Sequence, residues 1–294
     1  MEIYMTKQQL LAKLGYTERD RLLIIHSDDF GMCHSANVGT MQMLTEGVGT
    51  SASLLLPCPW AHEALAFWQQ HPELSIGVEI CLTSEWEKYR WGPLSSTDHV
   101  PSLFGKDGCF YSDGEQFNKQ ARFAEVEIES RAQIERVLSL GLQPTHLICH
   151  MDVLRLRPEF QRLFLALVIE YRLPARYPEL ELAQPWPVNE DCVAIDSHGT
   201  FPIELREKEI YAALRKMKPG IHEIFGHCSV DAEELRATTN FERRRQENPD
   251  SWRLRVHDTD LFCSHQMRQF LDDAQIYCIS WGQIRNVIES GPDS

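Results

Sequence analysis

Short apolar runs alternate along the chain with longer segments in which apolar residues recur every three or four positions. An apolar run bounded by polar residues predicts a strand buried on both faces, and the longer pattern predicts an amphipathic helix. We predict strands at residues 21–27, 51–56, 74–83, 145–149, 193–195, 221–225 and 276–279. We predict helices between Thr6 and Gly15 and at residues 36–46, 60–70, 121–140, 158–171 and 282–289.

Strands that alternate with helices indicate parallel βα units. No linker rich in Gly and Ser divides the chain, and no fixed-period repeat is visible. We therefore expect an α/β fold in which residues 1–294 form a single domain, a complete or deformed (β/α)-barrel.

Two excursions interrupt this alternation. Residues 84–118 are irregular and aromatic-rich, and their tryptophans argue against disorder. Residues 231–260 are polar and dense in charge, which predicts a solvent-exposed loop. Arg236 and the run 243–245 could instead contact an anionic substrate or a second subunit, so a homo-oligomer stays open.

Composition excludes some partners and indicates a compartment. The 43 acidic and 29 basic residues give a net charge of −14, which disfavours binding to nucleic acid and to anionic membranes. The longest apolar runs fall short of the roughly 20 residues that span a bilayer. The N-terminus shows no secretory signal pattern, and the nine cysteines form no CxxC pair. We therefore expect reduced thiols and a cytoplasmic protein.

Polar side chains follow several predicted strands. Asp28 and Asp29 end the first, Glu79 lies in the third, His150 ends the fourth, and His227 follows a later one. Taken singly, an acidic pair can cap a helix, a histidine can be structural, and a buried glutamate can belong to an ion pair. Because active sites of (β/α)-barrels lie at the carboxyl ends of the strands, their joint occurrence favours one site.

Carboxylates suit Mg²⁺ or Mn²⁺, and an imidazole also admits Zn²⁺ or Co²⁺. A metal with open positions can polarise a carbonyl, a free carboxylate can accept a proton from water, and a histidine can protonate the leaving group. These parts indicate metal-assisted hydrolysis of an amide or an ester.

Four motifs in order resemble those of the YdjC-like carbohydrate deacetylases, which include the chitooligosaccharide deacetylases and are related to the polysaccharide deacetylases. They are His26–Gly31 (HSDDFG), Gly77–Thr83 (GVEICLT), Pro144–His150 (PTHLICH) and His227. Residues 83–93, 170–174 and 279–281 are also similar to one branch, and the resemblance runs from about residue 6 to residue 288.

The resemblance implies a deformed (β/α)-barrel and metal-dependent removal of an N-acetyl group from an amino sugar or oligosaccharide. It implies that Asp28 is the catalytic base, that Asp29, Glu79 and His150 are metal ligands, and that His227 is an acid or a substrate contact.

The chain departs from the family pattern at two places. Glu79 stands where the family has a histidine, so two ligands are anionic and Mg²⁺ or Mn²⁺ is favoured over Zn²⁺. Two anionic ligands also weaken the metal as a Lewis acid. Ile148 and Cys149 stand where Asp-Ser is common. These departures leave open a catalytically silent carbohydrate-binding protein, and a metal-dependent sugar isomerase or aldolase is a further alternative.

Several residues are candidates for substrate binding. Trp86, Trp91 and Trp60 could stack on sugar rings or could pack the long loop against the barrel. Arg176 lies near a predicted strand and could orient Asp28.

Overall fold

The computed structural model describes residues 5–176, 203–238 and 251–291. Six parallel strands form the sheet, and their pairing path runs β4-β3-β2-β1-β5 with β6 also paired to β1. The strands are β1 (Arg21–Phe30), β2 (Ser51–Leu54), β3 (Ile76–Ile80), β4 (Leu147–Cys149), β5 (Gly220–Gly226) and β6 (Ile276–Cys278). Among the described residues, the path ends at β4 and β5 and does not close into a ring.

Strand β1 organises the sheet. On one side it pairs with β5 from Arg21 to Ser27; on the other, its first residues pair with β6 and its last with β2. Leu22 and Ile24 belong to one hydrophobic cluster, and Leu23 and Ile25 belong to a second. Both faces of β1 are therefore buried, as its continuous apolar run predicts.

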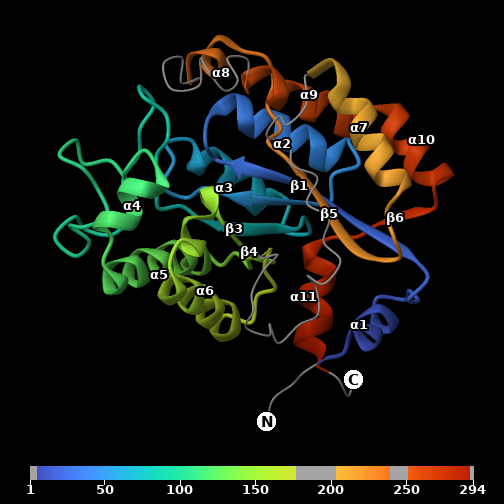
Figure 1. Ribbon diagram of the computed structural model, residues 1–294, viewed down its shortest axis with the longest axis horizontal. Coiled ribbons are helices and arrows are strands. Elements are labelled where there is room, and N and C mark those ends of the chain that lie inside the picture. The colour runs from blue at the N-terminus through green and yellow to red at the C-terminus, as the bar shows by residue number, and fades with distance from the viewer. Residues whose placement is uncertain (1–4, 177–202, 239–250, 292–294) are drawn as a thin grey trace.

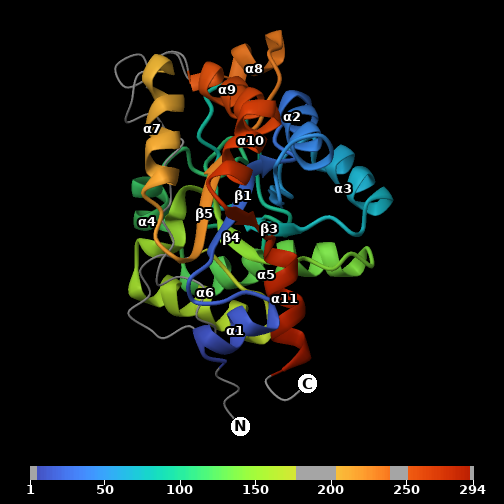
Figure 2. The same ribbon diagram turned by 90° about the vertical axis from the view of Figure 1, so that its right-hand side faces the viewer.

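Helices connect the strands and cover the sheet (Figure 1). They are α1 (Lys7–Lys13), α2 (His34–Thr45), α3 (Ala61–Gln70), α4 (Gly114–Gln120), α5 (Phe123–Ser139), α6 (Pro158–Glu170), α7 (Ile203–Arg215), α8 (Glu233–Thr238), α9 (Ser251–Cys263), α10 (His265–Asp273) and α11 (Trp281–Ser290), with a 3₁₀ helix η1 at His150–Arg155. Helices α9 and α10 lie on one side of the sheet and α5, α6 and α11 on the other (Figures 1 and 2). This mixed α/β, barrel-like architecture confirms the predicted fold class.

The first strand is longer than the predicted range 21–27 and includes the acidic pair. Strand β1 continues through Asp28 and Asp29 to Phe30, and its register with β2 shifts between Ser27 and Phe30. Asp29 has a left-handed backbone with φ of 63°. In a regular strand adjacent side chains point to opposite faces, so this local distortion decides where both carboxylates point.

The two excursions are more ordered than the sequence predicts. The first contains α4. The described part of the second contains α8 and α9, so the prediction of an exposed loop is wrong there. Helices α7 and α10 were not predicted, whereas residues 193–195 and 243–245 lie outside the described residues. In α9 the buried stripe includes Leu254, Arg255, Asp258, Leu261 and Phe262. Charged residues inside this stripe hide its helical periodicity.

Candidate active site

Asp29, Glu79 and His150 converge at the carboxyl ends of β1, β3 and β4. One potential ligand atom from each lies within 4.8 Å of the other two. His150 Nδ1 is 3.0 Å from Glu79 Oε1 and 3.3 Å from Asp29 Oδ1. All three residues are buried. Residues that are 121 positions apart at the extremes of this group are therefore neighbours in space, as the barrel prediction requires.

Neighbouring groups hold Glu79 and His150 in place. Glu79 Oε2 accepts hydrogen bonds from Ser53 Oγ at 2.7 Å and from the Asp29 backbone N–H at 3.1 Å. His150 Nε2 lies 3.1 Å from Glu85 Oε2. Because an ionised carboxylate only accepts, this contact makes Nε2 the donor and directs Nδ1 toward Asp29 and Glu79.

Burial and charge shift the pKa values of this cluster in opposite directions. Burial raises the pKa of Glu79 to about 7, against the lowering effect of its hydrogen bond with His150. Burial lowers the pKa of His150, but Glu85, Asp29 and Glu79 together raise it well above its ordinary value. The cluster thus carries more negative charge than one imidazole can balance.

Arg255 of α9 supplies a further positive charge. Its Nη2 lies 2.7 Å from Asp29 Oδ2, and His227 Nε2 lies 4.0 Å from the same oxygen. Burial raises the pKa of Asp29, but Arg255 and His227 outweigh it and hold that pKa well below the usual range. The sequence alone does not reveal the role of Arg255, because the charge density of its segment predicts an exposed loop.

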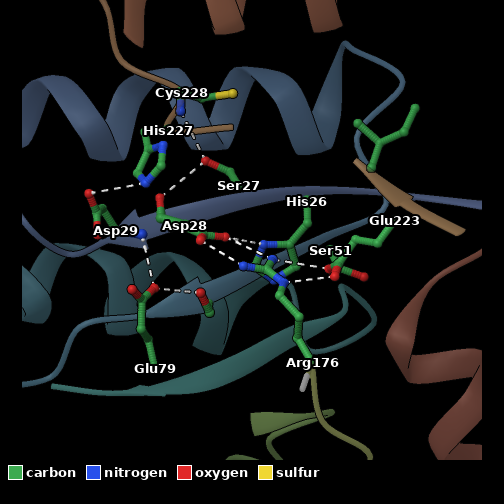
Figure 3. Close-up of polar contacts among 12 residues, drawn as sticks. His26, Ser27, Asp28, Asp29, Ser51, Glu79, Arg176, Glu223, His227 and Cys228 are labelled. Carbon is green, nitrogen blue, oxygen red and sulfur yellow. Dashed lines mark hydrogen bonds and ion pairs between the residues drawn. The ribbon is translucent and has the colours of Figure 1, made fainter. Parts of the chain in front are cut away.

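Asp28 belongs to a separate network (Figure 3). Arg176 Nη1 and Nη2 donate to its two carboxylate oxygens at 2.7 and 2.9 Å, and the same guanidinium makes two hydrogen bonds to Glu223 of β5. Burial raises the pKa of Asp28, but Arg176 and His26 together lower it below its ordinary value. The guanidinium thus orients Asp28, as the sequence suggests. It donates its hydrogen bonds to the carboxylates of Asp28 and Glu223.

Two histidines extend this network behind Asp28. His26 Nδ1 lies 2.7 Å from Asp28 Oδ1, and His26 Nε2 lies 2.8 Å from His146 Nε2. Burial lowers the pKa of His146 well below its ordinary value, and the positive charge of Arg176 lowers it further, so His146 is neutral. Asp28 accepts only, so His26 carries its proton on Nδ1.

Hydroxyl groups behind His146 determine which of its ring nitrogens carries the proton. Ser75 Oγ accepts from Ser51 Oγ–H and from the Gly282 backbone N–H. Its own proton is then directed to Thr145 Oγ1 at 3.0 Å, and the Thr145 hydroxyl donates to His146 Nδ1 at 2.9 Å. A neutral His146 then donates through Nε2 to His26. Every donor in this series of hydrogen bonds points toward Asp28.

His227 and the tryptophans have different surroundings. His227 is buried, and its backbone N–H donates to Asp258 Oδ2 at 2.8 Å.

Trp86 and Trp91 are only 2% and 3% exposed, and Trp91 Nε1 donates to the Thr83 carbonyl. Their burial matches packing of the loop against the barrel and leaves no open ring face for a sugar, whereas Trp60 is 39% exposed.

The two departures from the family pattern are neighbours. Glu79 of β3 is the register partner of Ile148 of β4. An aspartate at position 148 would therefore stand beside residue 79, where this chain places an apolar side chain next to its carboxylate.

Together these features define a class, a barrel-like α/β protein whose buried Asp-Glu-His cluster can hold a divalent metal beside the separately oriented carboxylate of Asp28. The chain belongs to the YdjC-like protein family, whose family model matches residues 22–273.

Relatives agree with this family assignment, and a solved structure agrees with the fold. The chain is 30% identical to a carbohydrate deacetylase of Thermus thermophilus, over 95% of its own length and 99% of the relative's. It is 36% identical to a carbohydrate deacetylase of Brevibacillus brevis over 54% of this chain and 60% of that one. A crystal structure from Enterococcus faecalis, described as a cellobiose-phosphate cleavage protein, has a similar fold, with a TM-score of 0.71, 21% identity and coverage of 89% of this chain and 98% of its own.

We expect Arg176→Met to lower the free energy of unfolding by about 3–5 kcal/mol at pH 7, because it leaves buried carboxylates without their cation. Urea unfolding measures the change. Arg131→Met is the matched control, since Arg131 also bridges two carboxylates, Glu127 and Glu170, but on the surface. We expect it to cost about 1 kcal/mol or less, because solvent screens the pairs.

The pH dependence has a defined sign. The lowered pKa of Asp28 stabilises the fold above the unfolded-state pKa of about 3.9, and this contribution is lost as the pH falls. The stability difference between the native protein and Arg176→Met should therefore narrow below about pH 4. A difference that stays constant down to about pH 3 would contradict the assigned network.

We also expect long-range ¹H–¹⁵N spectra near pH 7 to show His26 protonated on Nδ1 alone and His146 protonated on Nε2 alone. The directed hydrogen bonds allow no other pair of neutral tautomers. His26→Gln and His146→Gln spectra assign the signals. The opposite tautomer at either residue would show that the chain of donors is not directed toward Asp28.

Proposed function

We propose that this chain is a divalent-metal-dependent hydrolase that removes an N-acetyl group from an amino sugar or an oligosaccharide. The observation that carries the proposal is the convergence of buried Asp29, Glu79 and His150 next to the oriented carboxylate of Asp28. The names of the curated relatives support carbohydrate deacetylation as the reaction.

The residues of the cluster fit a divalent metal. Two carboxylates and one imidazole form a hard, anionic donor set, and Asp29 Oδ1 and Oδ2 accept no well-aligned hydrogen bond from the described residues. The contact of His150 with Glu85 resembles the carboxylate–histidine pairing that orients metal ligands. Because two ligands are anionic, we propose Mg²⁺ or Mn²⁺ rather than Zn²⁺.

When bound, the metal would polarise the acetyl carbonyl of the substrate. Asp28 would accept a proton from the attacking water, and Arg176 and His26 keep this carboxylate ionised and oriented. His227 would donate a proton to the leaving amine nitrogen as the amide C–N bond breaks. The products are acetate and the free amino sugar.

The remaining proposals concern the compartment, the oligomeric state and the alternative functions. Eight described cysteines are free, which supports the cytoplasm as the compartment. Among the described residues no helix is long and apolar enough to cross a bilayer. A homo-oligomer stays a prediction. The curated relatives favour the hydrolase over a silent carbohydrate-binding protein and over a sugar isomerase or aldolase.

We expect Asp28→Asn to abolish acetate release from N-acetylated amino sugars and to leave metal affinity within about threefold of the native value, because Asp28 lies outside the ligand cluster. His150→Ala should lower both. Acetate release and Mn²⁺ calorimetry measure the two properties. Sugar binding by the native protein without acetate release would instead support the silent alternative, and a new reducing sugar without acetate would support isomerase or aldolase chemistry.

We further expect exhaustive chelation to abolish acetate release, and Mg²⁺ or Mn²⁺ to restore it better than Zn²⁺, because carboxylate-rich sites prefer harder ions. Elemental analysis before and after chelation accompanies the assay. Full activity in protein that contains no metal would refute the metal-dependent reaction.

A further inference from the structure

The ligand cluster lies in an unusual concentration of buried negative charge. His150 contacts three buried carboxylates, those of Asp29, Glu79 and Glu85. Two of the three belong to the proposed ligand set. A divalent cation with two carboxylate ligands is nearly neutralised, and it therefore polarises a carbonyl less than a cation with one anionic ligand.

Among the residues that the structure describes, Arg255 is the arginine that contacts this ligand set directly. Its side chain is 10% exposed, and its Nη2 lies 2.7 Å from Asp29 Oδ2. Burial lowers the pKa of Arg255, but Asp29 outweighs this effect and raises it, so the charge persists at neutral pH.

The surroundings of Arg255 fix its position. The Arg255 carbonyl accepts from the Ser229 backbone N–H at 3.1 Å, which joins α9 to the segment after His227. Its guanidinium carbon lies 5.6 Å from the centre of the Trp86 ring. Its Nη1 has no hydrogen-bond partner among the described residues. Arg255 thus contacts Asp29 from a fixed helix rather than from a mobile surface chain.

We propose that Arg255 tunes the metal centre by offsetting the charge of one of its two carboxylate ligands. This inference rests on the proposed function and assigns Arg255 as a positioning residue that acts through Asp29. The guanidinium draws negative charge away from the cation at Asp29. A metal held there stays a stronger Lewis acid than the donor set alone would allow, at the cost of weaker electrostatic binding.

The proposal predicts opposite changes in affinity and rate. Two unit charges about 5 Å apart interact strongly even at an effective dielectric constant of about 20. Removing the arginine charge should therefore tighten Mn²⁺ binding about tenfold, while kcat for acetate release falls about tenfold or more. If Arg255 had only a structural role, its removal would damage the site, and Mn²⁺ affinity would fall instead of rising.

The experiment measures the Mn²⁺ dissociation constant of the full, metal-depleted chain by calorimetry, and kcat on an N-acetylated amino sugar. Arg255→Met and Arg255→Gln remove the charge, and Arg255→Lys keeps it and should stay within about threefold of native in both readouts. Arg206→Met is the matched control. Arg206 is a buried arginine of α7, and it pairs with Asp258, which lies on α9 as Arg255 does. Arg206→Met should not tighten Mn²⁺ binding.

The outcomes separate this inference from the proposed function. Weaker or unchanged Mn²⁺ binding in both neutral variants, provided circular dichroism shows them folded, overturns the role of Arg255. Tighter binding with unchanged or higher kcat also overturns it, because Arg255 would then merely compete with the metal. If the neutral variants do not fold, a Lys variant that changes Mn²⁺ affinity more than about tenfold refutes the charge argument. Absence of acetate release in the native protein refutes the proposed function, and the Mn²⁺ affinities then still test the charge offset.

Discussion

The site depends on one constraint, namely that carboxylates removed from water must be matched by cations or protons. Asp28, Asp29, Glu79 and Glu85 are buried at or near the carboxyl ends of the strands, and Glu223 is buried in the middle of β5. An isolated buried carboxylate is costly, so each needs a partner. Arg176, Arg255 and His150 supply these partners, and they determine how each carboxylate is oriented.

The pairing divides the acidic residues into two groups with different chemistry. Asp28 and Glu223 share Arg176 through four hydrogen bonds, which leaves the carboxylate of Asp28 ionised and its orientation fixed. Asp29 contacts Arg255 and His150, Glu79 contacts His150, and burial raises the pKa of Glu79 to about 7. The first group suits a base held in place, and the second suits the binding of an additional cation.

The structure also shows how Glu79 lies relative to Ile148, the other position at which the sequence departs from the motifs that it resembles. Because Ile148 is its register partner on β4, the two departures from the family pattern share one position in the sheet. In this chain the anionic side chain at this position of the sheet is Glu79 on β3, and its register partner on β4 is apolar. Ser53 and the Asp29 backbone N–H stabilise the carboxylate in this position.

The sequence alone predicted the six strands that the structure describes, six of the helices, and the acidic and histidine residues at the strand ends. These features are local, because apolar periodicity and the polar residues after a strand are read within a few positions. The barrel rule then predicted that Asp29, Glu79 and His150 would meet, although it said nothing of their orientation.

Only the tertiary structure decided which cation matches which carboxylate. Arg176 contacts Asp28 although the two residues are 148 positions apart in the sequence. Arg255 contacts Asp29 from α9, whose density of charged residues predicts an exposed loop. Asp28 and Asp29 are adjacent in the sequence but belong to different networks in the fold, and Asp29 has a left-handed backbone. A charged residue in a sequence is most often solvated, and only the packed fold shows that it is buried and which charge it meets.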